Sequence, residues 1–214
     1  FHYTPLDRGK EYIDSYETYL KTLFQFLQQV RSRHKSVFVV AHSMGGHIAL
    51  RTLVDHPELI DKLVLSAPMI RINTAWVPIH FITWLSQFLP GENYPPFYSL
   101  FKKSSNGMKF TTTSAERIDV YKKTYGQYPE IKRFGATMGW IRASQESIEI
   151  LFKSELSKIQ SPILLLQAEQ DYLVSNEAQS EICQRIEKCE LKMIEGSKHE
   201  LLFEQDTYRG KALL

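Results

Sequence analysis

Apolar residues recur three and four positions apart in residues 12–30, with polar residues between them. This spacing is that of one face of an α-helix. The apolar set is Ile13, Tyr16, Tyr19, Leu20, Leu23, Phe24 and Leu27. The pattern predicts an amphipathic helix in this stretch.

Four short runs of aliphatic residues predict β-strands, at 36–41, 62–67, 162–167 and 190–194. The first has almost no polar residue, which is typical of a central strand buried on both faces of a parallel sheet. A helix is predicted at 45–55, ending before Pro57 because proline does not continue a helix, and another at 178–188. Strands alternating with helices predict an α/β fold with parallel pairing and right-handed crossovers.

This regular alternation stops in residues 69–155. The stretch holds 15 of the 26 aromatic residues and carries 11 Lys and Arg against 7 Asp and Glu. We interpret it as a helical cap inserted into the α/β core, which would then consist of residues 1–68 and 156–214.

One predicted cap helix, at 76–89, gathers aromatic residues on one side. Phe81, Trp84 and Phe88 share that side with Val77 and Leu85. Seven of the cap's basic residues would frame this apolar side: Lys102, Lys103, Lys109, Lys122, Lys123, Lys132 and Arg133. Such a surface suits an amphiphile with an anionic head, or shallow contact with an anionic membrane. The alternative is that the aromatic side packs on the sheet and the lysines form a solvated rim.

The composition narrows the range of functions. The chain has 214 residues, 43% of them hydrophobic, and a net charge of +2, which disfavours intrinsic disorder and nucleic-acid binding. Cys183 and Cys189 lack a CxxC motif and neighbouring histidines, which argues against a zinc site or a disulfide framework and favours a reducing compartment. The most apolar stretch, 75–89, is too short to span a bilayer. Nothing in the sequence requires a metal or an organic cofactor.

The sharpest motif is Ala-His-Ser-Met-Gly-Gly at 41–46, between a predicted strand and a predicted helix. It is a variant of G-x-S-x-G, in which a strained turn exposes a nucleophilic serine and small neighbours prevent collisions. Ser43 is the predicted nucleophile, and the Met44 N–H at the helix start is the predicted oxyanion donor. The alternative is a serine that only caps the helix. His42 is interpreted as structural.

A serine nucleophile needs a base that is oriented by a carboxylate. In this architecture both follow the serine, each just beyond a strand. Asp171 and His199 fit those places, and Glu169, nearer its strand, is the rival acid that we expect to brace the loop. His2, His34, His47, His56 and His80 lack such a position.

Four segments together resemble the α/β-hydrolase superfamily, and within it the bacterial lysophospholipase and monoacylglycerol lipase group. They are residues 41–46, 63–69, 164–169 and 199–204, and the Gly-Trp-Ile-Arg segment at 139–142 resembles the lysophospholipases in particular. The resemblance implies a parallel sheet flanked by helices, with Ser43 as nucleophile, Asp171 as acid and His199 as base.

The implied function is a serine hydrolase that cleaves a carboxylic ester of a lysophospholipid through an acyl-enzyme. The alternatives are a monoacylglycerol lipase, a small-ester carboxylesterase, or a non-catalytic lipid-binding protein of the same fold. A proteinase is the weakest alternative, because the cap predicts a closed pocket. A cytoplasmic location is expected, with peripheral contact at the inner membrane face as a further expectation.

Two departures from the family pattern stand out. Ala41 replaces the first glycine of the elbow motif, as the bacterial lysophospholipases also show. The family places further strands and a His-Gly oxyanion loop before the serine, and neither is present before residue 36. We therefore expect a fragment that retains four strands of an eight-stranded sheet, with about 80 to 110 residues upstream at about 30 per strand-helix unit.

Overall fold

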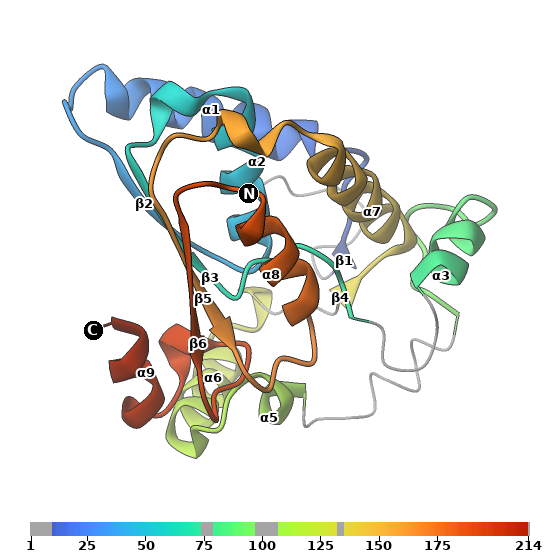
Figure 1. Ribbon diagram of the computed structural model, residues 1–214. Coiled ribbons are helices and arrows are strands. Elements are labelled where there is room, and N and C mark those ends of the chain that lie inside the picture. Colours follow the sequence, from blue (N-terminus) through green and yellow to red (C-terminus); the bar gives the residue numbers. More distant parts are fainter. Residues whose placement is uncertain (1–9, 74–78, 97–106, 132–134, 214) are drawn as a thin grey trace.

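The computed structural model describes residues 10–73, 79–96, 107–131 and 135–213 (Figure 1). The strands are β1 (Lys10–Glu11), β2 (Phe38–His42), β3 (Lys62–Ser66), β4 (Gly135–Ala136), β5 (Ile163–Ala168) and β6 (Cys189–Ile194). The α-helices are α1 (Glu17–Arg31), α2 (Met44–Asp55), α3 (Ile79–Ser86), α5 (Gly107–Thr111), α6 (Ala115–Gln127), α7 (Met138–Lys153), α8 (Asn176–Gln184) and α9 (Asp206–Leu213). The 3-10 helices are η1 (Pro57–Leu59), η2 (Pro129–Ile131), η3 (Leu156–Lys158) and η4 (Leu201–Phe203).

The main sheet has four parallel strands in the order β2-β3-β5-β6. All four correspond to predicted strands, each within two residues of the predicted bounds. In the register, Val40 pairs with Val64, and Leu65 pairs with Leu165. Because the strands are parallel, their carboxyl ends lie at one edge of the sheet, where the loops that carry the predicted site begin. The α/β prediction is confirmed.

One face of this sheet is covered by α1, α2 and α8 (Figure 1). Side chains from alternate strand positions, such as Leu63 and Leu165, pack there against Leu50 and Leu53 of α2 and Ile182 of α8. On the other face, α9 and η4 cover β5 and β6, where Leu201 and Ala212 join a smaller cluster. Burial on both faces explains why the centres of β3 and β5 are aliphatic.

Strand β2 differs from the prediction of a central strand buried on both faces. Phe38 and Val40 are 67% and 65% exposed. Within the described residues β3 is the sole strand paired with β2, and the face that carries these two side chains has no helix over it there. The apolar run predicted the strand correctly, but its position in the sheet depends on its neighbours.

The first helix begins at Glu17 rather than at residue 12. The chain is extended just before it, because Lys10 and Glu11 pair in parallel with Gly135 and Ala136. That pairing fixes the incoming backbone in a conformation that a helix cannot share. The apolar periodicity still locates the buried face, since Ile13 packs with the residues of the helix.

The described helices of the predicted cap lie in different parts of the structure. Helix α3 packs against α7, whereas α6 lies beside α9, to which the Arg117–Asp206 ion pair joins it, and α5 contacts α6 (Figure 1). Helix α7 contributes Leu151 to the core beneath the sheet, and its Ser147 contacts α2. This helix therefore packs with the core, although it falls inside the 69–155 boundaries, which stay a prediction. Val77, Lys102, Lys103, Lys132 and Arg133 lie outside the described residues, as does His2.

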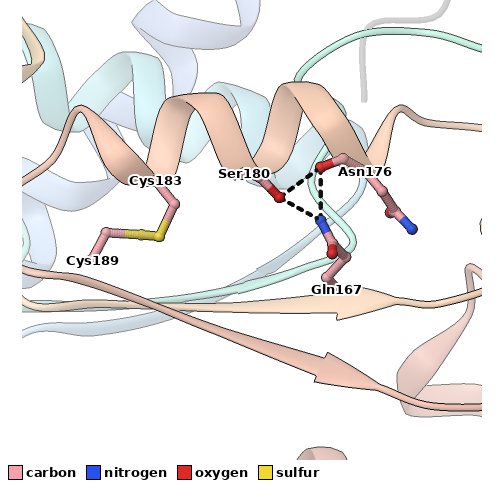
Figure 2. Close-up of a disulfide and its surroundings, with 5 residues drawn as sticks. All are labelled: Gln167, Asn176, Ser180, Cys183 and Cys189. Carbon is pink, nitrogen blue, oxygen red and sulfur yellow. Dashed lines mark hydrogen bonds between the residues drawn. A yellow bond between two sulfur atoms is a disulfide. The ribbon is translucent and has the colours of Figure 1, made fainter.

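The two cysteines form a disulfide, contrary to the sequence interpretation. Cys183 near the end of α8 is bonded to Cys189 at the start of β6 (Figure 2). The short connection turns α8 back onto the neighbouring strand, which brings the two Cα atoms to 5.3 Å. Spacing alone could not show that turn. The pairing removes the support that unpaired thiols gave to a reducing, cytoplasmic location.

Candidate active site

Ser43 occupies a sharp turn between β2 and α2. Its φ of 51° lies in the left-handed region, which a residue other than glycine rarely adopts. The turn is held by backbone hydrogen bonds on both sides: the Ser43 N–H donates to the Ser66 carbonyl at 3.0 Å, and the Ser43 carbonyl accepts from Met69 at 2.9 Å and His47 at 3.2 Å. The surrounding chain thus maintains a strained backbone that projects the serine.

The close approach at this elbow is made at Gly46 rather than at Gly45. A Cβ on Gly46 would lie 2.9 Å from Cβ and 3.2 Å from Cα of Pro68. A Cβ on Gly45 would meet nothing within 4 Å in the described part of the chain. The G-x-S-x-G pattern puts its second glycine at Gly45, two residues after the serine, but the packing of α2 against the loop after β3 makes the close approach one residue later.

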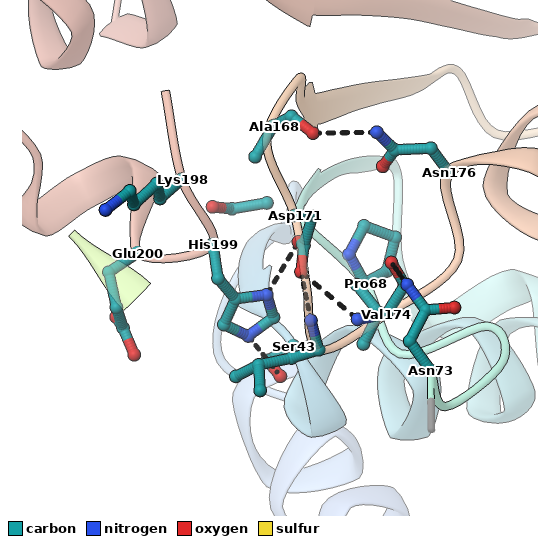
Figure 3. Close-up of polar contacts among 12 residues, drawn as sticks. Ser43, Pro68, Asn73, Ala168, Asp171, Val174, Asn176, Lys198, His199 and Glu200 are labelled. Carbon is teal, nitrogen blue, oxygen red and sulfur yellow. Dashed lines mark hydrogen bonds and ion pairs between the residues drawn. The ribbon is translucent and has the colours of Figure 1, made fainter. Parts of the chain in front are cut away.

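The structure brings Ser43, His199 and Asp171 together, although they are far apart in the sequence (Figure 3). His199 Nε2 lies 2.9 Å from Ser43 Oγ, and His199 Nδ1 lies 2.7 Å from Asp171 Oδ2. A carboxylate only accepts hydrogen bonds, so the Nδ1 proton points to Asp171 and Nε2 is left to accept from the serine hydroxyl. The side chains of His199 and Asp171 are 3% and 0% exposed, so water does not compete for these bonds.

The two candidate acids in the loop after β5, Asp171 and Glu169, make different contacts. Asp171 Oδ1 accepts from the N–H groups of Leu173 and Val174 at 2.9 and 3.1 Å, which holds Oδ2 toward His199. Glu169 Oε2 accepts from the Gly196 N–H at 2.8 Å and so ties its loop to the turn after β6. Its contact is the bracing contact expected from the sequence.

Met44 is the first residue of α2. The N–H groups of a helix's first turn have no acceptor within the helix and carry a partial positive charge. The Met44 N–H directly follows the strained serine, where the oxyanion of an acyl-transfer intermediate would form. Its role as a donor stays a prediction.

His42 lies against His199 rather than in contact with the serine hydroxyl. The two rings are 4.9 Å apart, His42 Nδ1 is 3.2 Å from Ser66 Oγ, and its Nε2 is 3.4 Å from Glu200 Oε2. Burial raises the pKa of Glu200, but the hydrogen bond from His42 and the nearby His42 and His199 rings outweigh it and hold that pKa below its usual range. His42 therefore packs beside His199 and pairs with Glu200, and it does not contact the serine hydroxyl.

Two acidic residues near the base were not recognised from the sequence. Glu200 directly follows His199, and Glu204 is fully buried four residues further on. Both lie in the segment 199–204 that carries the family resemblance, and a carboxylate in an otherwise apolar run was the available signal. His42, which pairs with Glu200, and Thr113, which donates to Glu204, come from other parts of the chain, so spacing alone did not reveal these acids.

The predicted substrate-contacting residues form an exposed ridge on and just after α3. Phe81, Trp84 and Phe88 are 53%, 54% and 67% exposed. Their rings contact one another in succession, with centroids 5.8 Å apart in a tilted pair and 5.1 Å apart in an edge-to-face pair. Ser86, on another side of the helix, is buried. The aromatic side therefore does not pack on the sheet, and its role in substrate binding stays a prediction.

The described residues contain no group of three or more His, Cys, Asp or Glu side chains placed to hold a metal ion. Within the same part of the chain, every helix is too short or too polar to cross a bilayer. His47 and His56 lie on α2 and at its end, and His34 lies in the turn before β2. In the described residues, none of these three rings is hydrogen-bonded to the Ser43 hydroxyl, and His47 reaches Ser43 only through its backbone N–H.

Sequence relatives are found along nearly the whole chain. It is 27% identical over 209 residues to the probable lysophospholipase L2 of Haemophilus influenzae, covering 95% of this chain and 66% of the relative. It is 28% identical over 221 residues to lysophospholipase L2 of Escherichia coli, covering 94% and 63%. The chain thus spans about two thirds of the length of the curated relatives it matches.

Solved structures show the same fold. A soluble variant of monoglyceride lipase from Saccharomyces cerevisiae aligns with a TM-score of 0.74 at 18% identity, covering 97% of this chain and 70% of that one. The monoacylglycerol lipase of Paleococcus ferrophilus aligns with a TM-score of 0.67 at 16% identity, covering 93% and 72%. The family model described as serine aminopeptidase, S33, matches residues 6–206. The chain therefore belongs to that family, in the lysophospholipase and monoacylglycerol lipase group of the α/β-hydrolases.

Proposed function

We propose that this protein is a serine hydrolase that cleaves the carboxylic ester of a lysophospholipid through an acyl-enzyme on Ser43. The observation that carries the proposal is the continuous series of contacts from Ser43 through His199 to Asp171, at 2.9 and 2.7 Å, on a strained elbow. A serine that only capped α2 would need no histidine on its hydroxyl, and its side chain makes no capping hydrogen bond.

In the proposed reaction, Ser43 Oγ attacks the ester carbonyl while His199 Nε2 takes its proton. Asp171 stabilises the imidazolium that forms, and the Met44 N–H donates to the oxyanion. The C–O bond to the leaving alcohol then breaks, and His199 returns the proton to that alcohol. Water, activated by the same histidine, releases the fatty acid and restores the serine hydroxyl.

The substrate class rests on the relatives and on the α3 ridge. Both curated relatives reported above are named as lysophospholipases. An exposed row of Phe81, Trp84 and Phe88 suits contact with acyl chains at a lipid surface, since large aromatic groups otherwise favour burial. A monoacylglycerol lipase is the second candidate, because the two solved structures reported above are lipases of that type.

A labelling experiment tests the nucleophile. A fluorophosphonate probe should add covalently to the wild-type protein and fail to add to Ser43→Ala. Ser32→Ala is the matched control, because its hydroxyl lies at the exposed end of α1 and donates only to the Gln29 carbonyl. Labelling that persists in Ser43→Ala would refute the proposed nucleophile. A protein that binds lipids but neither labels nor turns over would be a non-catalytic member of the fold.

Kinetics test the acid and the base. Ser43→Ala and His199→Ala should each lower kcat by about 10⁶-fold, and Asp171→Ala by about 10⁴-fold. The double Ser43→Ala/His199→Ala variant should lose little more, because the residues act as one unit. Greater damage from Glu169→Ala than from Asp171→Ala would overturn the assignment of the acid.

A substrate panel tests specificity. Lysophospholipid should be hydrolysed faster than monoacylglycerol or a short p-nitrophenyl ester at equal concentration. Replacing Phe81 and Trp84 by alanine should weaken hydrolysis of the long-chain lipids and leave the short ester unchanged. Phe26→Ala, an exposed aromatic on α1, is the control. Equal losses on long and short substrates would contradict a role of the ridge in lipid contact.

A further inference from the structure

Glu204 is a fully buried acid whose carboxylate is paired with no cationic side chain of the described residues; the Arg117 guanidinium donates to its backbone carbonyl. Its carboxylate instead accepts hydrogen bonds from backbone N–H groups and hydroxyls. Oε1 accepts from the N–H of Thr113 at 3.0 Å and of Lys198 at 2.9 Å. Oε2 accepts from Thr113 Oγ1 at 2.5 Å, from Thr112 Oγ1 at 3.2 Å and from the N–H groups of Thr113 and Gln205 at 2.9 and 3.0 Å. Both oxygens act as acceptors only, as a carboxylate does.

These donors come from two separate parts of the chain. Thr112 and Thr113 lie between α5 and α6, in the stretch 69–155 that the sequence assigns to the cap. Lys198 immediately precedes the proposed base, His199. The carboxylate of Glu204 therefore connects the segment before α6 to the loop that carries the base.

The backbone on the other side of His199 is held by the same segment. The Glu200 N–H donates to the Thr111 carbonyl at 2.8 Å. The single proton of the Thr112 hydroxyl is shared between Glu204 Oε2 at 3.2 Å and the Phe203 carbonyl at 3.0 Å. His199 is thus flanked by one residue bonded to Glu204 and one bonded to the end of α5. Its ring can keep the 2.9 Å and 2.7 Å contacts to Ser43 and Asp171 only while this backbone stays in place.

We propose that Glu204 is a positioning residue for His199, through which the segment 111–113 holds the base in register with the nucleophile. The inference rests on the proposed function, because it assumes that His199 is the base. Loss of the carboxylate would leave the N–H groups of Thr113 and Lys198 buried without an acceptor. The loop would have to move to rehydrate them, and a displacement of about 1 Å at a catalytic group can cost about 100-fold in rate.

The test compares Glu204→Gln with a neighbouring change that spares the carboxylate. The glutamine amide turns an NH2 group toward donors, so kcat per active site should fall about 100-fold, with KM for a short soluble ester nearly unchanged. Active sites are counted with the fluorophosphonate probe, so unfolded protein does not enter the rate. Gln205→Ala is the control, because it removes only an exposed hydrogen bond to the Thr113 carbonyl, at 3.1 Å. Its kcat should equal that of the wild type.

A milder pair of variants covers the case in which Glu204→Gln does not fold. Thr113→Val removes the hydroxyl that donates to Oε2 and keeps the N–H, whereas Thr113→Ser keeps both. Thr113→Val should lower kcat, and Thr113→Ser should restore it. The low-field NMR signal of the proton between His199 and Asp171 should shift or broaden in Thr113→Val and stay in place in Gln205→Ala.

Wild-type kcat per titrated site and an unchanged low-field signal in the Glu204 or Thr113→Val variants would overturn the inference. That result differs from failure of the proposed function, which would appear as turnover in Ser43→Ala. A Ser43→Ala protein without turnover beside a fully active Glu204→Gln protein would reject the positioning role alone.

Discussion

The buried histidine His47 makes the stability of this protein depend on pH. It lies on α2, one turn after the elbow, and is fully buried against Tyr16 and Ser147. Its Nε2 is 2.7 Å from Ser147 Oγ, which also accepts from Arg51 Nη1 at 2.9 Å. With Arg51 donating to that oxygen, the Ser147 proton is free to point to Nε2, and a second positive charge on the imidazole would lie beside the Arg51 cation. The site therefore fits a neutral imidazole.

The pKa of His47 is lowered from 6.5 to about 3. Burial is the larger cause, and the neighbouring Arg51 cation is the second. In the unfolded chain the ring takes up a proton near pH 6.5, whereas in the folded protein it stays neutral until about pH 3. Because the unfolded state binds the extra proton in this window, the free energy of unfolding falls as the pH falls through it. The contribution is complete above about pH 6.5 and is lost progressively below.

The size of the effect follows from the difference in pKa. One proton changes the free energy by about 1.4 kcal/mol per pH unit once the pH is well below the unfolded pKa. Between pH 7 and pH 5, His47 should cost about 2 kcal/mol of stability. Carboxylates whose pKa values are lowered, such as Asp61, titrate below pH 5 and therefore do not contribute to this change.

Urea unfolding followed by circular dichroism at pH 5, 6 and 7 measures this slope. His47→Gln keeps an amide near Ser147 but cannot titrate, so its stability should fall by about 2 kcal/mol less than that of the wild type between pH 7 and pH 5. His34→Gln is the control, because His34 is exposed in the turn before β2. Parallel pH curves for wild type and His47→Gln would refute the reasoning.

Three further predictions concern packing and covalent structure. Gly139→Ala should destabilise the protein by about 1 to 3 kcal/mol in thermal or urea unfolding, because the added Cβ would lie 2.6 Å from a ring atom of Tyr12. Gly126→Ala in α6 is the control: its Cβ would meet nothing within 4 Å in the described residues, so its stability should be unchanged or higher. Gly46→Ala should reduce fluorophosphonate labelling, because displacing α2 from the loop after β3 moves the elbow, and full labelling would contradict this. Titration of the denatured protein should find no free thiol, and replacing Cys183 and Cys189 by serine should cost about 2 kcal/mol for so short a loop; two free thiols would contradict the pairing.

Much of the fold follows from local patterns in the sequence. Strands β3 and β5 have continuous aliphatic centres, at 63–65 and 163–166, and such runs predict burial wherever the chain folds as α/β. The order of the motifs also predicted the site, because the serine, the acid and the base each follow a strand at the same edge of the sheet. Ser43, Asp171 and His199 could be chosen in this way because their chemistry demands those residue types in that order.

Tertiary structure decided the features that depend on partners distant in the sequence. The pattern could not show that Phe38 and Val40 would be exposed in the described structure, because exposure depends on which strands and helices cover β2. It could not show the role of Glu204 either, since its donors come from residues more than ninety positions away and from the loop of the base itself. Local propensity acts through neighbours in sequence, whereas burial and hydrogen bonding act through neighbours in space, and only the folded chain determines the latter.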